Sequence, residues 1–202
     1  MMFWDNVAWV YDIFAIVINK KADKALCAAT EKLISPSDSV LECACGTGLL
    51  TGAIAPRCKS LIATDISEKM LKRAKKKFGK HKNVRFEKAD ISRLPYPDNC
   101  FDTVVAANVI HLLDDPLPAL SELDRVCKPG GKIVIPTYIN RRESGKTNGV
   151  SDMIGKAGAD FKRAFTFDTY KKFFSDAGYG DASYVLCEGV IPCAVAILKK
   201  RQ

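Results

Sequence analysis

Short apolar runs alternate with segments of helical periodicity along most of the chain. Helical patterns span residues 22–33, 67–78 and 116–127, the second capped by Ser67 and the third opened by Pro116. The runs between and around them are rich in β-branched residues and are predicted as strands, at residues 40–43, 60–64, 83–88, 102–107 and 132–137. This alternation predicts a parallel sheet covered by helices on both faces.

The pattern changes toward the C-terminal end. A helix capped by Thr166 or Asp168 is expected to end at Gly178. Two further β-rich runs follow and predict a pair of adjacent strands at the sheet edge, at residues 182–188 and 190–198. Residues 140–160 are polar, weakly periodic and interrupted by glycines, so a mobile lid is one interpretation of this segment.

The composition describes one folded domain, predicted to span residues 1–202. Hydrophobic residues make up 48% of the chain, which excludes disordered and collagen-like classes and is enough for a full core. The apolar stretch 7–18 is interrupted by Asp12 and follows no basic residue, unlike a signal peptide. No run reaches the ~20 apolar residues of a membrane-spanning helix. We therefore expect a cytoplasmic protein.

The cysteines and histidines offer no ligand set with the spacing of a metal site. No Cys-x-x-Cys pair occurs among the eight cysteines, and His81 and His111 lie far apart. Several cysteines fall inside apolar runs, so we interpret them as small buried hydrophobic residues. No metal cofactor is predicted.

The strongest local signal lies at residues 40–48, where a buried strand runs directly into a glycine turn and a helix. Gly46 and Gly48 permit close approach of the backbone to a ligand. The amides at the start of the next helix favour a carboxylate or phosphate. A tight strand-to-helix turn that binds nothing would explain the same residues.

Two acidic residues end the following strands. The Asp65 carboxylate could accept hydrogen bonds from the vicinal hydroxyls of a ribose, and Asp90 could accept from an adenine amino group. Either acid alone is as well explained by a structural role at a strand end. Together with the glycine loop they favour a nucleoside cofactor. A dinucleotide is disfavoured, because Thr51 occupies the last glycine position of the Gly-x-Gly-x-x-Gly fingerprint and Gly52 comes one residue late.

At these residues the chain resembles the class I S-adenosylmethionine-dependent methyltransferases, and in particular the small bacterial enzymes similar to the ubiquinone and menaquinone biosynthesis methyltransferases. The resemblance covers about residues 36–138 and rests on five ordered segments, at residues 42–48, 63–71, 89–98, 100–105 and 128–132. It implies a Rossmann-like three-layer sandwich whose seven-stranded sheet is mostly parallel, with the last strand antiparallel. It also implies S-adenosyl-L-methionine as cofactor and S-adenosyl-L-homocysteine as product.

The resemblance implies roles for the residues of the glycine loop and the second strand. Gly46 and Gly48 would pass beside the methionine portion and the ribose of the cofactor. Glu42 would steady the loop or bind the amino group of the cofactor. Asp65 would hold the ribose.

The adenine and the methyl donor would be held further along the sheet. Ile66 would pack on the adenine face, and Asp90 would accept a hydrogen bond from its amino group. The amide of Ile91 would meet a ring nitrogen, and Met70 is assigned to the same site. Asn108, just past the fourth strand, would line the methyl-donor pocket through its backbone.

One position departs from the family pattern. The first glycine of the acid-x-Gly-x-Gly-x-Gly loop is Ala44 here. Alanine tolerates ordinary negative φ but not positive φ, so the loop is expected to form if this position is not left-handed. Ala44 therefore stays among the predicted cofactor-binding residues.

Methyl transfer from a sulfonium removes a positive charge, so the enzyme mainly has to align the nucleophile with the methyl carbon. A general base is needed only if the nucleophile starts protonated with a high pKa. His111 is a candidate base, although a packed helix residue fits the pattern equally well.

The N-terminal segment is the second source of candidate catalytic residues. In the family that the chain resembles, this segment, assigned here to residues 1–35, commonly closes over the cofactor. Tyr11 is therefore a candidate catalytic residue in the wall of the pocket, and Tyr138, after the fifth strand, is a second candidate for that wall. An amphipathic helix packed on the core would explain the same aromatic spacing. Residues 36–138 would form the cofactor-binding core, and residues 139–202 the lid, a helix and the edge strands.

The positive charge of the chain is concentrated at residues 69–88, which carry ten Lys or Arg and one acid, Glu87. We interpret this segment as a solvated outer face, with attraction to nucleic acid or an anionic membrane as the alternative. The run 106–109 lacks the Asn/Asp-Pro-Pro-aromatic motif of base methyltransferases, which disfavours nucleic acid.

We therefore predict S-adenosylmethionine-dependent methyl transfer to a small-molecule acceptor. The alternatives are an RNA or protein methyltransferase that uses the basic segment, a nicotinamide oxidoreductase, and a cofactor-binding protein without turnover. Peripheral membrane contact and the oligomeric state are left open.

Overall fold

The computed structural model describes residues 19–140 and 162–200. Its strands form one sheet of seven, in the order β3-β2-β1-β4-β5-β7-β6, in which β7 runs antiparallel to the other six. The strands are β1 (Ser39–Cys43), β2 (Ser60–Asp65), β3 (Val84–Lys88), β4 (Phe101–Ala106), β5 (Cys127–Tyr138), β6 (Ser183–Cys187) and β7 (Cys193–Lys199). The sheet predicted from the sequence, with an antiparallel last strand, is confirmed.

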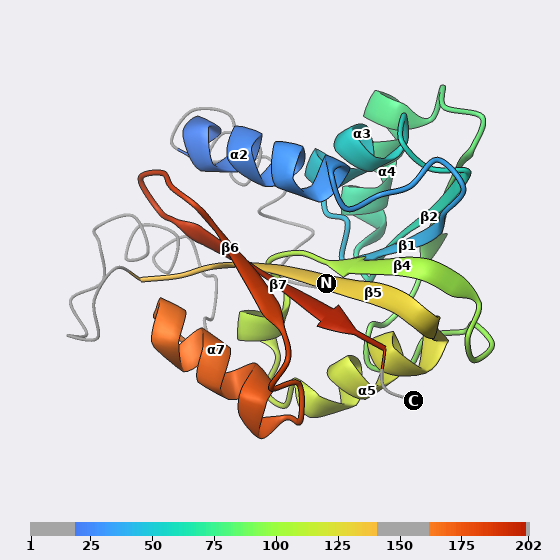
Figure 1. Ribbon diagram of the computed structural model, residues 1–202. Helices are drawn as coiled ribbons and strands as arrows, with labels where there is room; N and C mark the ends of the chain where they lie inside the picture. Colours follow the sequence, from blue (N-terminus) through green and yellow to red (C-terminus); the bar gives the residue numbers. More distant parts are fainter. Residues whose placement is uncertain (1–18, 141–161, 201–202) are drawn as a thin grey trace.

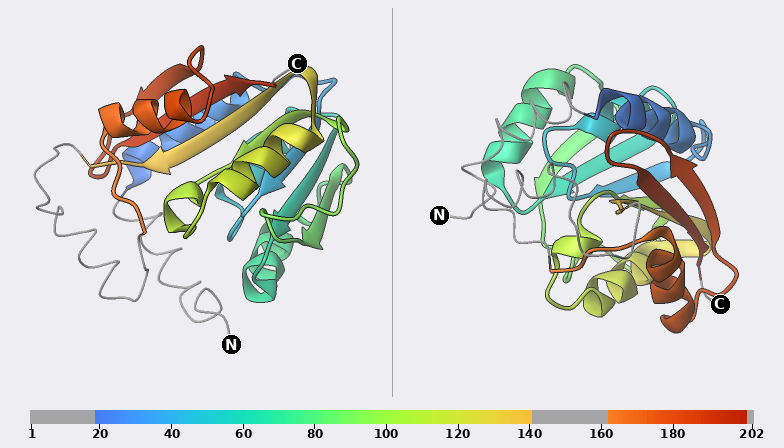
Figure 2. Two further views of the ribbon diagram at one scale, coloured as in Figure 1. Left: turned by 90° about the horizontal axis from the view of Figure 1, so that it is seen from below. Right: turned by 90° about the vertical axis from the view of Figure 1, so that its left-hand side faces the viewer.

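Helices cover both faces of this sheet, so the molecule has three layers (Figure 1). One face carries α2 (Lys20–Glu31), α3 (Leu49–Ile54) and α4 (Glu68–Phe78), and the other carries α5 (Leu117–Val126) and α7 (Phe167–Asp176). A short 3-10 helix, η2 (Ile110–Leu112), follows β4. Figure 2 shows the same layers from two further sides.

The central strands are mostly apolar, because successive side chains point to opposite faces and both faces are covered by helices. Val104 of β4 belongs to the core shared with α5 and α7, whereas Val105 belongs to the core shared with α2 and α3. In β5, Ile133 and Val134 divide between the two cores in the same way.

Local signals set the helix starts as the sequence predicted. The Ser67 hydroxyl caps α4 by accepting a hydrogen bond from the Met70 amide at 3.2 Å. Thr166 caps α7 in a capping box with Thr169. Pro116 stands immediately before α5.

The sequence Lys128-Pro129-Gly130-Gly131 is typical of a turn, yet in the structure it is part of β5. Cys127 pairs with Phe101 and Lys132 with Thr103, so the register shifts between the two pairs. Gly130 has a φ of 77°, and a Cβ on Gly131 would lie 2.7 Å from the carbonyl oxygen of Asp102. The two glycines therefore allow a bulge that keeps the strand paired instead of ending it.

Some predictions fall outside the described residues. These are the roles of residues 1–18, including Tyr11, and nearly all of the lid expected at 140–160. Within the parts that the structure does describe, no helix is both long and apolar enough to cross a membrane.

Candidate cofactor site

The carboxyl ends of β1 to β4 meet around a cavity of about 320 Å³, within the size range of small-molecule sites. Such an edge is where open α/β sheets bind ligands. Eight of the ten predicted cofactor-binding residues lie on its wall, namely Ala44, Gly46, Asp65, Ile66, Met70, Asp90, Ile91 and Asn108. Glu42 and Gly48 do not.

The loop after β1 brings Gly46 to the wall in a left-handed conformation, with a φ of 55°. A Cβ at this position would have no atom within 4 Å, so the backbone there faces open space. The Gly46 amide donates to Asp65 Oδ2 at 2.8 Å. Gly46 therefore joins the ends of β1 and β2 and leaves room for a ligand against the loop.

Gly48 has a structural reason to be glycine. It is the N-cap of α3 with a φ of 92°, and a Cβ there would lie 2.8 Å from two ring carbons of Phe78. The second glycine of the motif thus allows α3 to pack against α4, and it does not line the cavity.

Ala44 is in the left-handed region, with a φ of 54°. The condition placed on the loop, that this position is not left-handed, is therefore not met, and the loop forms with alanine in that conformation. The Cys45 amide donates to the Thr64 carbonyl at 2.8 Å and the Gly48 amide to the Cys45 carbonyl at 2.9 Å. These bonds close the tight loop in which Ala44 is left-handed, a conformation that strains alanine more than it would strain glycine.

Asp65 ends β2 with its carboxylate fixed from both sides. Oδ2 accepts from the Gly46 amide and Oδ1 from the Ser67 amide, each at 2.8 Å. The side chain is buried and still forms part of the cavity wall. A carboxylate oxygen can accept more than one hydrogen bond, so these backbone bonds orient the group without excluding a ligand hydroxyl.

Apolar side chains beside Asp65 form a surface suited to a flat ring. Ile66 is 39% exposed although it is a large apolar residue, and Met70 and Ile91 lie on the same wall. Asp90 stands next to them, and its Oδ1 accepts from the Ser92 amide at 2.8 Å. A ring with a polar edge would find both an apolar face and a hydrogen-bond acceptor here.

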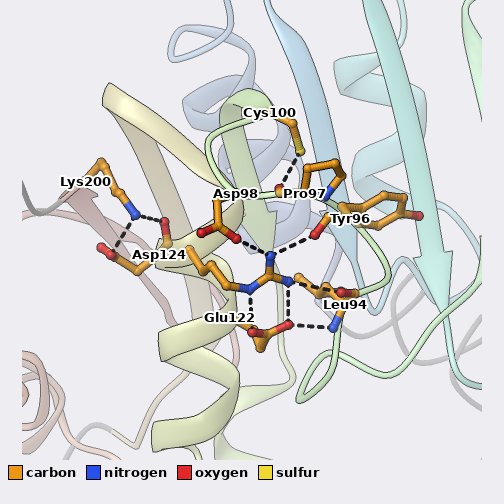
Figure 3. A network of polar contacts seen from close by, with 9 residues as sticks. Leu94, Tyr96, Pro97, Asp98, Cys100, Glu122, Asp124 and Lys200 are labelled. Atoms are coloured by element: carbon orange, nitrogen blue, oxygen red, sulfur yellow. Dashed lines mark hydrogen bonds and ion pairs between the residues drawn. The ribbon is translucent and has the colours of Figure 1, made fainter.

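Arg125 of α5 anchors the loop that carries Asp90 and Ile91. Figure 3 shows the partners of its guanidinium, among them Leu94, Tyr96 and Glu122. The guanidinium donates to the carbonyl oxygens of Leu94 and Tyr96, at 3.0 and 2.8 Å. It also binds both carboxylate oxygens of Glu122, at 2.7 and 2.8 Å, and this hydrogen bonding lowers the pKa of Glu122. The Leu94 amide donates to Glu122 Oε2 at 2.7 Å, so the ion pair holds the loop through its backbone.

Glu42 is buried beneath the loop and does not reach the cavity wall. Its Oε2 accepts from the Thr51 hydroxyl of α3 at 2.6 Å. Burial raises the pKa of Glu42 to about 8, against the lowering effect of that hydrogen bond. Of the two roles expected for it, this geometry favours steadying the loop.

Asn108 follows β4 on the cavity wall, with a φ of 52°. Its amide donates to the Pro136 carbonyl at 2.8 Å, and its Oδ1 accepts from the Tyr138 amide at 3.0 Å. Asn108 thereby ties the end of β4 to the end of β5.

Five wall residues were missed by sequence reasoning. They are apolar residues that carry no chemical signal, and their position just after a strand or beside η2 is the feature that could have indicated them: Ala89, Ala107, Val109, Leu112 and Leu113.

His111 lies in η2 and is not among the residues of the cavity wall. Its side chain is 4% exposed, and burial lowers its pKa to about 4. The imidazole is therefore neutral near pH 7 and a poorer base than an exposed histidine. Tyr11, the other candidate catalytic residue, lies outside the described part of the chain.

Comparison with known sequences agrees with this arrangement. The methyltransferase domain family matches residues 41–135. A demethylmenaquinone methyltransferase of Clavibacter sepedonicus is 33% identical over 134 residues, which cover 65% of this chain and 55% of that protein. The ubiquinone/menaquinone biosynthesis C-methyltransferase of Teredinibacter turnerae is 33% identical over 147 residues, or 69% of this chain and 59% of that protein. The chain thus spans somewhat more than half the length of these relatives.

Solved structures share the fold. A SAM-dependent methyltransferase from Thermotoga maritima superposes with a TM-score of 0.74 at 21% identity, covering 98% of both chains. A SAM-dependent methyltransferase from Aquifex aeolicus gives a TM-score of 0.66 at 22% identity, covering 94% of this chain and 93% of its own. Residues 41–135 are therefore a methyltransferase domain, and the chain has the fold of S-adenosylmethionine-dependent methyltransferases.

Proposed function

We propose that this chain transfers a methyl group from S-adenosyl-L-methionine to a small-molecule acceptor and leaves S-adenosyl-L-homocysteine as product. The observation that carries the proposal is Asp65, a buried carboxylate that two backbone amides hold in place on the cavity wall. Such a group suits the two adjacent hydroxyls of a ribose, which need an acceptor of fixed orientation.

The remaining wall residues fit the other parts of the cofactor. The open space at Gly46 would take the methionine portion and the ribose, and Ile66 and Met70 would cover the adenine face. Asp90 would accept from the adenine amino group, and the Ile91 amide would donate to a ring nitrogen. The bound cofactor supplies an electrophilic methyl group on a sulfonium, and the protein has to hold that methyl in line with the acceptor.

The acceptor is proposed to be a small, largely apolar ring compound. The relatives above are named for demethylmenaquinone and for ubiquinone and menaquinone biosynthesis. Val109, Leu112 and Leu113 make the cavity wall beyond Asn108 apolar, which suits such a compound. His111 and Tyr11 remain candidate catalytic residues, and the cytoplasmic location remains a prediction.

Calorimetry tests cofactor binding. S-adenosylhomocysteine should bind the wild-type chain, NAD should not, and Asp65→Ala should weaken the affinity at least about tenfold, the loss expected for a charge-assisted hydrogen bond. Equal affinity of wild type and Asp65→Ala would remove the ribose assignment. Binding of S-adenosylhomocysteine without methyl transfer to a panel of reduced quinones and phenols would favour a cofactor-binding protein without turnover.

A further inference from the structure

The start of α2 holds two buried polar side chains one helical turn apart. Asn19, the N-cap of the helix, is 1% exposed, and Asp23 is 4% exposed. This end of the helix lies on the side of the sheet where β5 ends, as Figure 1 shows. The two residues are therefore on the same side of the molecule as the cofactor cavity.

Each of these side chains satisfies one polar atom and leaves the other unsatisfied. Asn19 Oδ1 accepts from the Ile191 amide at 3.1 Å, and Asp23 Oδ1 accepts from the Tyr138 hydroxyl at 2.8 Å. Asn19 Nδ2 and Asp23 Oδ2 are buried and have no hydrogen-bond partner in the described part of the chain. One donor and one acceptor thus lack a partner in a place where water is scarce.

The surroundings of this pair are closely packed. A Cβ on Gly189, in the hairpin between β6 and β7, would lie 2.5 Å from Ala22 Cβ and 2.9 Å from Asn19 Oδ1. Because the hairpin closes so tightly on the helix, the unsatisfied atoms belong to a built site and not to a frayed helix end.

Tyr138 connects this pair to the cofactor cavity. Its hydroxyl binds Asp23, while its own amide donates to Asn108 Oδ1 at 3.0 Å. Asn108 lies on the cavity wall at the end of the neighbouring strand. Asp23 is therefore linked to the wall through one residue, on the β4–β5 side of the cavity.

A hydroxyl group is complementary to this pair, because it can donate to Asp23 Oδ2 and accept from Asn19 Nδ2 at the same time. We infer that Asn19 and Asp23 bind an acidic ring hydroxyl of the methyl acceptor, that Asp23 takes its proton, and that Tyr138 positions Asp23. This inference rests on the proposed function and adds the base and the residue that positions it.

The reaction balances with these groups. The proton of the acceptor hydroxyl passes to Asp23 Oδ2, and the electron pair of the O–H bond stays on the acceptor and makes an adjacent ring carbon nucleophilic. That carbon forms a bond to the methyl group as the bond from methyl to sulfur breaks, and the electron pair of the broken bond stays on sulfur. The ring hydrogen at that carbon then leaves to water as a proton, and Asp23 returns its proton to the acceptor oxygen.

The electrostatic surroundings allow Asp23 to serve as this base. Burial raises its pKa to about 6, whereas the hydrogen bond from Tyr138 lowers it. Among the described residues, the other titratable groups that act on it are Cys27 and Cys193, whose thiol pKa values burial raises, so both are neutral near pH 7. Asp23 is thus mostly ionised at neutral pH while close enough to its pKa to accept a proton.

Binding of a defined probe tests the site. The protein is saturated with S-adenosylhomocysteine under reducing conditions and titrated with 1,4-dihydroxynaphthalene, and in parallel with 1,4-dimethoxynaphthalene, which cannot donate a hydrogen bond. The diol should bind wild type at least about tenfold more tightly than the diether, because the diether cannot form the hydrogen bond to the charged Asp23. Asp23→Asn should remove that preference, and the matched control Asp176→Asn, an exposed acid on α7, should keep it.

Turnover supplies a readout that a purely structural role would not change. With the diol as acceptor, kcat of wild type should fall on acidification with an apparent pKa near 6, and Tyr138→Phe should move that fall to higher pH because it removes the bond that lowers the pKa of Asp23. Asp23→Asn should abolish this limb while its affinity for S-adenosylhomocysteine stays within about twofold of wild type.

Several outcomes would overturn the inference. Equal binding of diol and diether by wild type would mean that the pair holds only a buried water, and no binding of the diol at all would exclude this acceptor class. The comparison of diol and diether binding uses the wild-type chain, so it tests the inference even if Asp23→Asn does not fold. Failure of wild type to bind S-adenosylhomocysteine would instead refute the proposed function itself.

Discussion

Phe78, at the C-terminal end of α4, lies directly against Gly52 of α3, so that a Cβ at position 52 would be 2.6 Å from Phe78 Cε1. The same ring stands 2.8 Å from the place of a Cβ on Gly48, one turn earlier. Two helices that flank the cofactor loop therefore meet through a single ring on two glycines. This contact explains why residue 52 is a glycine, although it stands one residue beyond the last glycine of the dinucleotide-binding fingerprint.

Gly52→Ala should destabilise the protein. Replacing glycine by alanine inside a helix normally adds about 1 kcal/mol of stability. Here the ring has to move, and we expect overpacking to reduce the free energy of unfolding by about 1–3 kcal/mol. Urea unfolding of Gly52→Ala, Phe78→Leu and the double variant measures this, because the smaller side chain should relieve the added methyl.

The matched control is Gly180→Ala, whose Cβ would have only Ser175 Oγ nearby, at 4.0 Å. It should stay within about 0.5 kcal/mol of wild type. Additive effects in the double variant would show that Phe78 and Gly52 are not coupled.

Ala44→Gly should stabilise the folded protein. The left-handed conformation of Ala44 costs about 1–2 kcal/mol relative to glycine, while glycine loses about 0.4–1 kcal/mol through the freedom of the unfolded chain. The net gain in the free energy of unfolding is expected at about 0.5–1 kcal/mol. Ala29→Gly, in the regular helix α2, should have the opposite sign. A loss of stability in Ala44→Gly would mean that the loop relaxes around alanine.

Local sequence signals were sufficient for the strands, the helix caps and the residues that follow β1, β2 and β3. These features follow from the local hydrophobic pattern and from residues close in sequence, as in the cap of α4, where Ser67 binds the amide of Met70. The strain at Ala44 did not follow from sequence, because its φ is set by loop closure through hydrogen bonds to the next strand. Asp23 and Tyr138 are 115 residues apart, and Asp23 reads as an ordinary acid in the first turn of a helix until the fold brings the end of β5 to it.

Glu42→Gln should change how stability depends on pH. The pKa of Glu42 is about 8 in the folded protein and about 4.3 when unfolded, so folding favours the protonated form. That contribution is complete below pH 4 and is lost as pH rises toward 8. Glutamine does not titrate, so the stability of the variant relative to wild type should increase between pH 5 and 8, by at most about 1.4 kcal/mol per pH unit.

Chemical unfolding at pH 5, 6.5 and 8 measures this difference. Glu31→Gln, a partly exposed glutamate on α2, serves as the control and should run parallel to wild type within about 0.5 kcal/mol. Affinity for S-adenosylhomocysteine discriminates between the two roles expected of Glu42. It should be nearly unchanged in Glu42→Gln if the residue steadies the loop through Thr51, whereas a loss of tenfold or more would indicate contact with the cofactor's amino group.

The basic segment 69–88 forms an exposed face on α4 and the edge strand β3, and all ten of its Lys and Arg side chains are exposed. Among the described residues, Lys88 pairs with Glu68 at 3.0 Å and Arg85 with Glu87 at 3.7 Å. Such exposed pairs contribute little, so the face stays strongly positive. Substitutions on this face therefore test whether the methyl acceptor is a small molecule or RNA.

Reversing three charges on this face, Lys72, Lys76 and Lys80 to Glu, should leave methyl transfer to a small acceptor within about twofold of wild type, because none of these side chains lines the cavity. The matched control changes three exposed lysines elsewhere, Lys32, Lys59 and Lys199, to Glu. Gel-shift titration of wild type with an unstructured RNA at several salt concentrations completes the test. Binding whose salt dependence tracks several phosphate contacts, and which only the first variant loses, would favour an RNA methyltransferase instead.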